Sequence, residues 1–307
     1  MRRVLQWMAG NSWMRRNLPR LWFARRAVRR FMPGEKAEDA LDAAQKFQAQ
    51  GMGVLFTHLG ENVTRQEHHE RAADHYAWLI EEAHRRGING EASVKLTHLA
   101  MDMSTAAMQA HMDRLAFLAR ENGDRTLWID MEGSDYTEGT IAEYERLKQA
   151  HANVGICLQA YLKRTYSDVE RLLPLSPKIR LVKGAYSEPA EICYRSRREV
   201  DANYLALCVS MLAARKAGRD LFLGLGTHDV RLIEQTAQHA QSIGLTRTDF
   251  DVEMLYGIRT GQQRRLKNNG YNVRVLIAYG EHWYPWYMRR LAERPANVVF
   301  ALRQLLP

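Results

Sequence analysis

The sequence predicts a closed (β/α)8 barrel of the TIM type, with helical segments before its first strand. Short runs of β-branched and apolar residues alternate with longer segments of helical period along most of the chain. We count eight such units of about 30 residues, which favours a closed parallel barrel over an open doubly wound sheet. No GxGxxG motif follows any of the predicted strands, so the pattern does not support a Rossmann-type site.

The predicted elements follow one another in strict order. The strands are expected at Gly53–Thr57, Ala92–Leu96, Thr126–Met131, Val154–Gln159, Ile179–Lys183, Leu221–Leu225, Asp251–Leu255 and Val273–Ala278. Helical period is found near 64–87, 104–122, 136–150, 165–174, 195–218, 229–243, 260–269 and 283–295. Gly, Asn or Pro stands at many of the joints, as expected where a chain must turn between regular elements.

The basic charge is concentrated at the start of the chain. The net charge is +9, and residues 1–34 hold nine arginines and no acidic residue, so the remaining 35 basic and 35 acidic residues cancel. Tryptophan, methionine, leucine and phenylalanine lie between these arginines. We therefore divide the chain into a basic amphipathic arm, residues 1–34, and a barrel domain, residues 35–307. The arm either packs on the barrel or lies on an anionic membrane surface, and nucleic acid is the least favoured partner.

Composition excludes several other classes of protein. With 307 residues, 46% of them hydrophobic, the chain can bury a large core without disulfides. Three cysteines and eleven histidines show no spacing typical of a metal site, so no metal is expected. No apolar run reaches the length of about 18 residues that spans a bilayer.

Polar residues gather where the predicted strands end. These residues are Lys95, Asp130, Glu132, Gln159, Arg180, Lys183, Thr227, His228, Asp229 and Glu253. In a barrel, the carboxyl ends of the strands converge on one mouth, and charged residues inside a buried parallel sheet are costly unless they are paired or face a ligand. A site for an anionic ligand explains this set better than separate structural roles do.

The last predicted helix carries a second group of cations. Arg289 and Arg290 precede Glu293 by four and three residues, so the carboxylate can orient either guanidinium while the other binds a planar anion. A solvated helix face with ordinary ion pairs is the alternative reading of this pattern alone.

Six motifs carry a family resemblance. They are SVKL at 93–96, YLKRT at 161–165, RLVKGAY at 180–186, GTHD at 226–229, MLYG at 254–257 and the segment Trp283–Pro295. In this order and spacing they resemble proline dehydrogenase, an FAD-dependent barrel enzyme of proline catabolism. The resemblance extends from about residue 35 to the end.

The resemblance implies roles for individual residues. Arg180, Lys95 and Asp130 match catalytic positions, and Gln159, Arg180, Val182, Lys183, Gly184, Thr227 and His228 match positions that hold FAD; Arg197 matches a pyrophosphate contact more loosely. Lys95, Arg289, Arg290 and Glu293 match groups that bind the substrate, and Ala185, Tyr186 and Leu255 match its pocket wall. The implied reaction is hydride transfer from the imino acid to FAD N5, giving 1-pyrroline-5-carboxylate, after which electrons pass to a membrane quinone.

The chain departs from the family pattern at the pocket wall. Leu276 and Trp286 stand where the family has tyrosines, and Ala278 stands where a proline is common. We therefore expect either proline or a related ring such as hydroxyproline or pipecolate as the main substrate. The resemblance also favours the membrane reading of the arm, and it implies the bacterial cytoplasm, at the inner face of the cytoplasmic membrane.

Two other functions are compatible with parts of the sequence. A flavin barrel of the methylenetetrahydrofolate reductase kind is similar in fold, but Lys95, Arg289 and Arg290 suit a small carboxylate better than a pterin. A basic lipid- or nucleic-acid-binding protein without enzymatic activity is supported by the arm alone.

Overall fold

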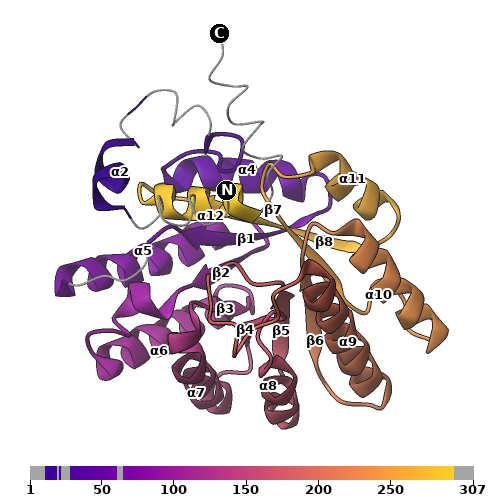
Figure 1. Ribbon diagram of the computed structural model, residues 1–307. Helices are drawn as coiled ribbons and strands as arrows, with labels where there is room; N and C mark the ends of the chain where they lie inside the picture. The colour runs from indigo at the N-terminus through magenta and orange to yellow at the C-terminus, as the bar shows by residue number, and fades with distance from the viewer. Residues whose placement is uncertain (1–10, 19–20, 22–27, 61–64, 294–307) are drawn as a thin grey trace.

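The computed structural model describes residues 11–18, 21, 28–60 and 65–293, and eight parallel strands in it close into one barrel in chain order. The helices form a ring around the strands (Figure 1). Strand β1 pairs with β2 on one side and with β8 on the other, which closes the sheet. The predicted fold class is confirmed.

The strands are short and almost entirely buried. They are β1 (Gly53–His58), β2 (Gly90–Val94), β3 (Leu127–Ile129), β4 (Val154–Gln159), β5 (Lys178–Val182), β6 (Phe222–Gly226), β7 (Asp251–Leu255) and β8 (Asn272–Tyr279). The helices that follow them are α5 (Gln66–Arg85), α6 (Thr105–Glu121), α7 (Ser134–Ala150), α8 (Thr165–Leu172), α9 (Arg197–Lys216), α10 (Val230–Ser242), α11 (Thr260–Asn268) and α12 (Trp283–Glu293).

The expected bounds of six strands differ from the observed ones by one to two residues at an end, and in two of them the difference moves a predicted catalytic residue of the mouth out of the strand. Strand β2 ends at Val94, and Lys95 begins a 3₁₀ turn, η2 (Leu96–Leu99). Strand β3 ends at Ile129, so Asp130 follows it. Both side chains therefore belong to connecting segments at the barrel mouth. The apolar residues beside them are part of the core, so the sequence pattern does not show where these strands end.

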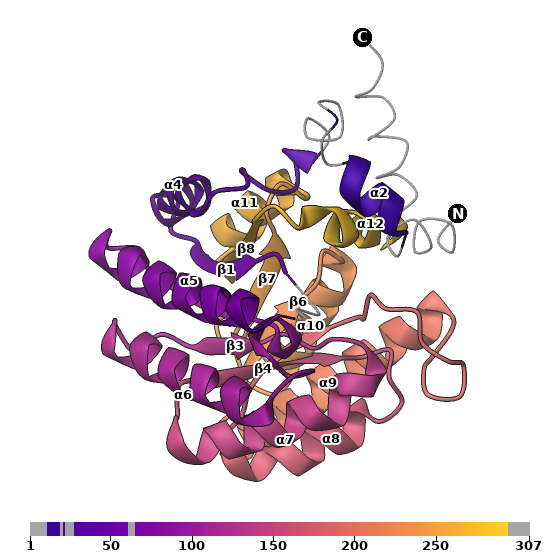
Figure 2. The ribbon, with the colours of Figure 1, turned by 90° about the vertical axis from the view of Figure 1, so that its left-hand side faces the viewer.

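Three segments before β1 pack on the barrel or on α12. Helix α4 (Ala37–Gln48) has a buried face of alanines and Leu41. Val28, Phe31 and Met32 form an apolar cluster with α12, in which the rings of Phe31 and Tyr287 meet at a centroid distance of 5.5 Å. Met14 and Leu18, in and just after α2 (Ser12–Asn17), pack against the same cluster, and α2 lies beside α12 in Figure 2.

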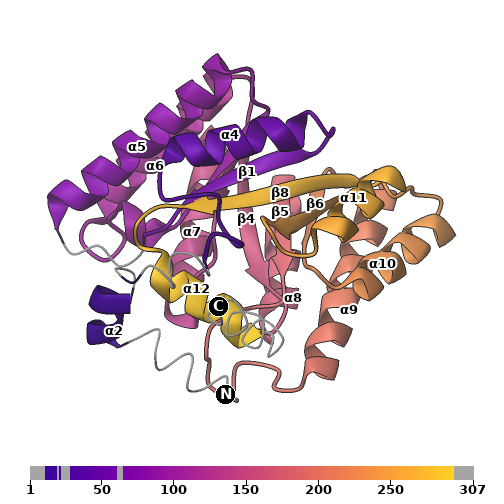
Figure 3. The same cartoon turned by 90° about the horizontal axis from the view of Figure 1, so that it is seen from above.

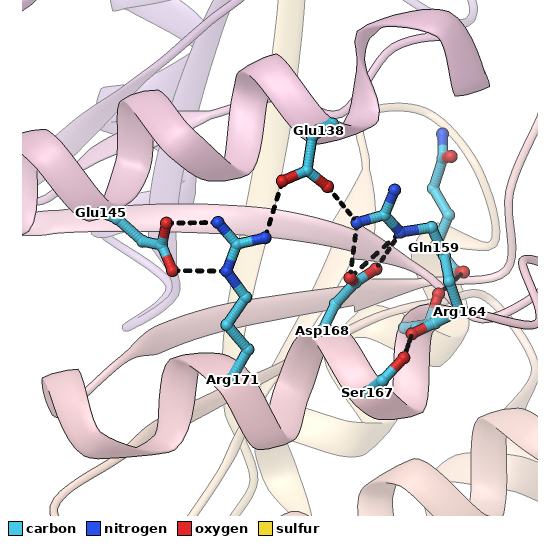
Figure 4. A network of polar contacts seen from close by, with 8 residues as sticks. Glu138, Glu145, Gln159, Arg164, Ser167, Asp168 and Arg171 are labelled. Atoms are coloured by element: carbon cyan, nitrogen blue, oxygen red, sulfur yellow. Dashed lines mark hydrogen bonds and ion pairs between the residues drawn. The ribbon is translucent and has the colours of Figure 1, made fainter.

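The outer faces of α7 and α8 are joined by a network of charged residues (Figure 4). Glu138 of α7 accepts hydrogen bonds from Arg164 and Arg171, whose Nη atoms lie 2.5 and 2.7 Å from its oxygens. Arg171 also forms a two-bond pair with Glu145, and Arg164 pairs with Asp168 one turn along. The network fixes the start of α8, where the Thr165 hydroxyl donates to the carbonyl of Gln159.

Among the described residues, no helix has the length and apolar character needed to cross a bilayer. Cys157, Cys193 and Cys208 are buried and not disulfide-bonded.

Candidate active site at the barrel mouth

Asp130 is the centre of a buried charge network at the ends of β2, β3 and β5. Its carboxylate accepts hydrogen bonds from the Ser93 hydroxyl, at 2.7 Å, and from Arg180. Its second oxygen lies 3.6 Å from Nζ of Lys95. Arg180 also donates to Ser93 Oγ at 2.7 Å and lies over the Trp128 ring. The three residues that the sequence singles out as catalytic are therefore in direct contact.

The charges of this network support one another. Burial disfavours the ionised Asp130, yet the charges of Arg180 and Lys95 hold the pKa of its carboxyl below the ordinary value. Burial likewise disfavours the Arg180 guanidinium, but Asp130 raises its pKa. Both groups are ionised at neutral pH, so a fixed positive charge stands at the floor of the mouth.

A cavity of about 840 Å³ opens between α12 and the ends of β1, β2 and β8. Lys95, Trp286 and Arg289 line it together, although they come from segments almost 200 residues apart in the chain. Helix α12 follows β8 and lies over this end of the barrel (Figure 3). Two of the cations assigned to the substrate carboxylate thus face one space.

The other members of the α12 group are placed differently. The Arg290 guanidinium lies 5.9 Å from the centre of the Trp286 ring, which orders both side chains. Arg289 lies over the ring of Tyr186, 5.4 Å from its centre, and so connects α12 to the loop after β5. Glu293 is the last residue of α12, and its side chain lies outside the described residues.

The wall residues fall into two groups. Leu255 and Leu276 are register partners on the adjacent strands β7 and β8, and both are half-buried. Ala185 and Tyr186 follow β5 and are also half-buried. Ala278, two residues beyond Leu276, is fully buried.

The residues assigned to the cofactor surround the ends of β4, β5 and β6. Gln159 and Val182 are register partners, and Val182 pairs in turn with Gly226. Gln159 is 3% exposed, and its Oε1 has no hydrogen-bond partner in the described part of the chain. Thr227 is the first residue after β6 and is buried. The next residue, His228, accepts a hydrogen bond at Nε2 from the backbone N–H of Leu255 at 3.3 Å. A buried, unsatisfied amide oxygen is suited to a bound group that donates a hydrogen bond.

Gly184 gives the backbone a shape that no other residue tolerates there. Its φ is +109°, and an added Cβ would lie 2.1 Å from the Tyr161 ring. The chain after β5 therefore lies closely against the Tyr161 ring. The unpaired Gln159 oxygen at the end of β4 and the buried Arg180 charge on β5 are the features of this region that fit a bound group.

Lys183 and Arg197 belong to a second charge cluster, between α9 and α10. Lys183 Nζ pairs with Asp201 and with Asp229, the latter at 2.9 Å, and Arg197 lies 3.2 Å from Asp229. Burial favours the neutral Asp229, but Lys183 and Arg197 lower its pKa to about 2. Arg197, Arg198 and Arg231 line a groove of about 570 Å³ here, which suits a phosphate-bearing ligand.

Sequence reasoning missed several residues of the mouth. Asp201 lies within α9, where no strand-end signal marks it. His58 and Tyr279 end β1 and β8 and line the cavity with Lys95. Both follow apolar strand residues in the sequence, and this position at a strand end could have identified them as candidates for the mouth. Within the described ranges no cluster of metal-binding side chains occurs.

These features define a class: a parallel (β/α)8 barrel enzyme with a charged site at the carboxyl ends of its strands. The sequence profile of the family "Proline dehydrogenase" matches residues 40–303. Proline dehydrogenase 1 of Bacillus subtilis is 32% identical over 282 residues, which cover 92% of this chain and 91% of that protein. The proline dehydrogenase of Deinococcus radiodurans is 34% identical over 282 residues, covering 90% and 89%. The chain belongs to the proline dehydrogenase family and is an oxidoreductase.

The fold comparison agrees. A crystal structure of proline utilization A from Bdellovibrio bacteriovorus superimposes with a TM-score of 0.80 at 20% identity. It matches 94% of this chain but only 38% of its own, so this chain corresponds to about a third of that larger protein.

Proposed function

We propose that the protein oxidises L-proline, or a closely related cyclic imino acid, to 1-pyrroline-5-carboxylate by hydride transfer to FAD. The observation that carries this proposal is the convergence of Lys95 and Arg289 on one cavity beside the buried Arg180–Asp130 pair. Two cations from different elements suit a small carboxylate, and family membership names the imino acid.

The proposed roles of Lys95 and Arg289 follow from the cavity that they line together, and those of Arg290 and Glu293 follow from the family resemblance. Lys95 and Arg289 bind the carboxylate from two sides, and Arg290 and Glu293 complete the clamp from α12. Asp130 keeps Lys95 and Arg180 in place. Orienting a carboxylate in this way holds the ring carbon beside nitrogen in one position, which lowers the entropy cost of the reaction.

The proposed cofactor residues are Gln159, Arg180, Val182, Lys183, Gly184, Arg197, Thr227 and His228. FAD supplies the hydride acceptor when bound. Arg180 places a positive charge where the reduced ring gains electron density, and Lys183 and Arg197 offer charge to the pyrophosphate.

The direct test is spectroscopic. Purified protein is expected to be yellow, and L-proline added without oxygen should bleach the flavin absorbance. The Arg264→Met variant, which changes an exposed arginine on α11, serves as a control and should bleach like the wild type. Colourless protein that takes up no added FAD would contradict the proposal.

The pocket wall favours a second substrate class as an alternative. Leu276 and Trp286 replace two phenols, which leaves the wall more apolar and larger near Leu276. We expect L276Y to increase the preference for proline over pipecolate by roughly 10-fold, because the larger side chain fills the pocket, and a filled apolar pocket discriminates against one extra ring methylene by about 1 to 3 kcal/mol. Steady-state kcat/KM values on proline, hydroxyproline and pipecolate measure this. If the wild type already prefers proline by orders of magnitude, proline alone is the substrate.

We also propose a membrane quinone as the electron acceptor, with the basic arm at residues 1–34 at the inner face of the cytoplasmic membrane of a bacterium. The arginine excess of the arm supports this proposal. An acceptor dissolved in the bilayer is reached most readily by an enzyme held at its surface.

A further inference from the structure

Charged residues form two layers inside the barrel. In the lower layer, Arg274 of β8 lies between Glu91 of β2, at 2.8 Å, and Asp251 of β7. In the upper layer, Arg180 binds Asp130. Glu253 stands between the layers, two residues after Asp251 and therefore on the same face of β7.

Glu253 contacts the upper arginine but is incompletely bonded. Its Oε2 lies 3.4 Å from Nη1 of Arg180. Its Oε1 is buried without a hydrogen-bond partner in the described part of the chain. The neighbouring strand β6 has Gly224 at this point, where a Cβ would lie 2.5 Å from Oε1. The barrel thus leaves room for this carboxyl without giving it a second donor.

The surroundings of Glu253 balance its charge closely. Arg180 on β5 and Arg274 on β8 favour the carboxylate, whereas Asp251 on β7 and Glu91 on β2 oppose it. Burial is the largest effect and raises the pKa of Glu253 to about 7. Asp130, in contrast, stays ionised, so Glu253 is the partner of Arg180 whose charge can change near neutral pH.

We propose that Glu253 is a positioning residue of the redox reaction: it binds a proton when negative charge forms above Arg180 and releases it when that charge leaves. The inference rests on the proposed function, because the negative charge is that of the reduced flavin. Negative charge above Arg180 interacts with the same guanidinium that stabilises the Glu253 carboxylate. The carboxylate is then less well stabilised, so Glu253 takes up a proton.

The step balances. In the first half-reaction the C–H bond beside the ring nitrogen breaks, its electron pair and hydrogen pass to the flavin, and the nitrogen proton goes to water. Glu253 takes one further proton from water, and its own oxidation state does not change. In the second half-reaction a quinone takes two electrons and two protons, one of them the hydrogen that came from the substrate and the other from water, and Glu253 gives its own proton back to water.

The experiment measures the flavin midpoint potential against pH, from pH 5.5 to 8.5, in the holoprotein. The wild type is expected to take up one extra proton per electron pair in a window that begins near pH 7. Glu253→Gln should lose this extra proton. The control is Glu143→Gln, which changes another buried, arginine-paired carboxylate, on α7 outside the barrel, and should keep the wild-type profile.

A second measurement does not depend on a variant that folds. The infrared difference spectrum of the wild type, reduced minus oxidised, should gain the band of a protonated carboxyl, and labelling with ¹³C-glutamate should shift that band. Absence of the extra proton or of the band in flavin-loaded wild type overturns the inference, as does an unchanged profile in E253Q. Protein that binds no flavin contradicts the proposed function itself.

Discussion

At the scale of single residues, two glycines have backbone angles that other residues rarely adopt. Gly184 combines a positive φ with a neighbouring aromatic ring, while Gly218, after α9, has a φ of +87° and nothing within 4 Å of an added Cβ. A comparison of substitutions at the two glycines therefore distinguishes the cost of a left-handed backbone from the cost of a steric clash.

We expect Gly218→Ala to lower the free energy of unfolding by about 1 kcal/mol, from the left-handed backbone alone. Gly184→Ala should lower it by a further 1 to 3 kcal/mol, because its Cβ meets the Tyr161 ring. Urea unfolding followed by circular dichroism measures both. Equal losses in the two variants would mean that the ring moves aside without cost.

The sequence pattern also predicts that charged residues gather at the strand ends, while their roles stay predictions. Lys95, Asp130 and Arg180 were singled out because charges at the ends of buried strands need a reason, and the structure brings them into contact. The unsatisfied Oε1 of Glu253 could not be foreseen, since it depends on the small size of Gly224 across the strand pair. Asp201 lies on a helix, where acidic residues are common and carry no signal.

At the scale of elements, neighbouring helices are joined by charges on their outer faces as well as by their buried sides. Glu138, on α7, receives two arginines from the segment that contains α8, and these hydrogen bonds lower the pKa of its carboxyl to about 2. A depressed pKa contributes stability that is present above the ordinary value near 4.5 and is lost as pH falls from there towards 2.

Glu138→Gln should therefore lower the free energy of unfolding at pH 7 by less than about 1 kcal/mol, because the side chain is mostly exposed to water. The loss should shrink in 1 M NaCl and vanish near pH 2. Thermal unfolding at several salt concentrations measures it, and Glu170→Gln, whose carboxyl is on an exposed part of α8, is the control. A loss that salt does not change would indicate packing instead of charge.

Element boundaries followed the sequence pattern less closely than element order did. The alternating segment Ala92–Leu96 predicts one strand, yet β2 begins at Gly90 and ends at Val94, just before η2. Leu96 and Leu99 are buried in the turn, so hydrophobicity continues after the strand geometry stops. Periodicity alone cannot distinguish these cases.

At the scale of the whole molecule, the basic arm and the barrel are not simply separate. Val28, Phe31 and Met32 are buried against α12, and the carbonyl of Arg30 stands where a Cβ of Gly257 would be. Packing on α12 therefore explains the apolar residues at positions 28, 31 and 32 of the arm. The proposed membrane contact depends on the arginines of the arm.

We expect the wild type to sediment with anionic liposomes at low salt. Replacing Arg2, Arg3, Arg15 and Arg16 by glutamine should weaken this binding by about 4 kcal/mol, roughly 1 kcal/mol for each charge near the surface. Unlike truncation, these changes keep Val28, Phe31 and Met32 of the apolar cluster in the chain. Replacing four exposed arginines of the barrel, Arg71, Arg114, Arg198 and Arg264, gives the matched control. Equal sedimentation of both variants would place the membrane contact elsewhere.

The apolar cluster between residues 28–32 and α12 also sets the order of events during synthesis. Val28 and Phe31 are among the first described residues to leave the ribosome, whereas Trp283 and Tyr287 are among the last. At 5 to 20 residues per second, roughly 10 to 50 s separate them. Strand β1 likewise waits for β8. A nascent chain therefore carries an unpaired β1 edge and an uncovered apolar segment until β8 and α12 appear, so the mouth of the barrel forms only after both elements have been made.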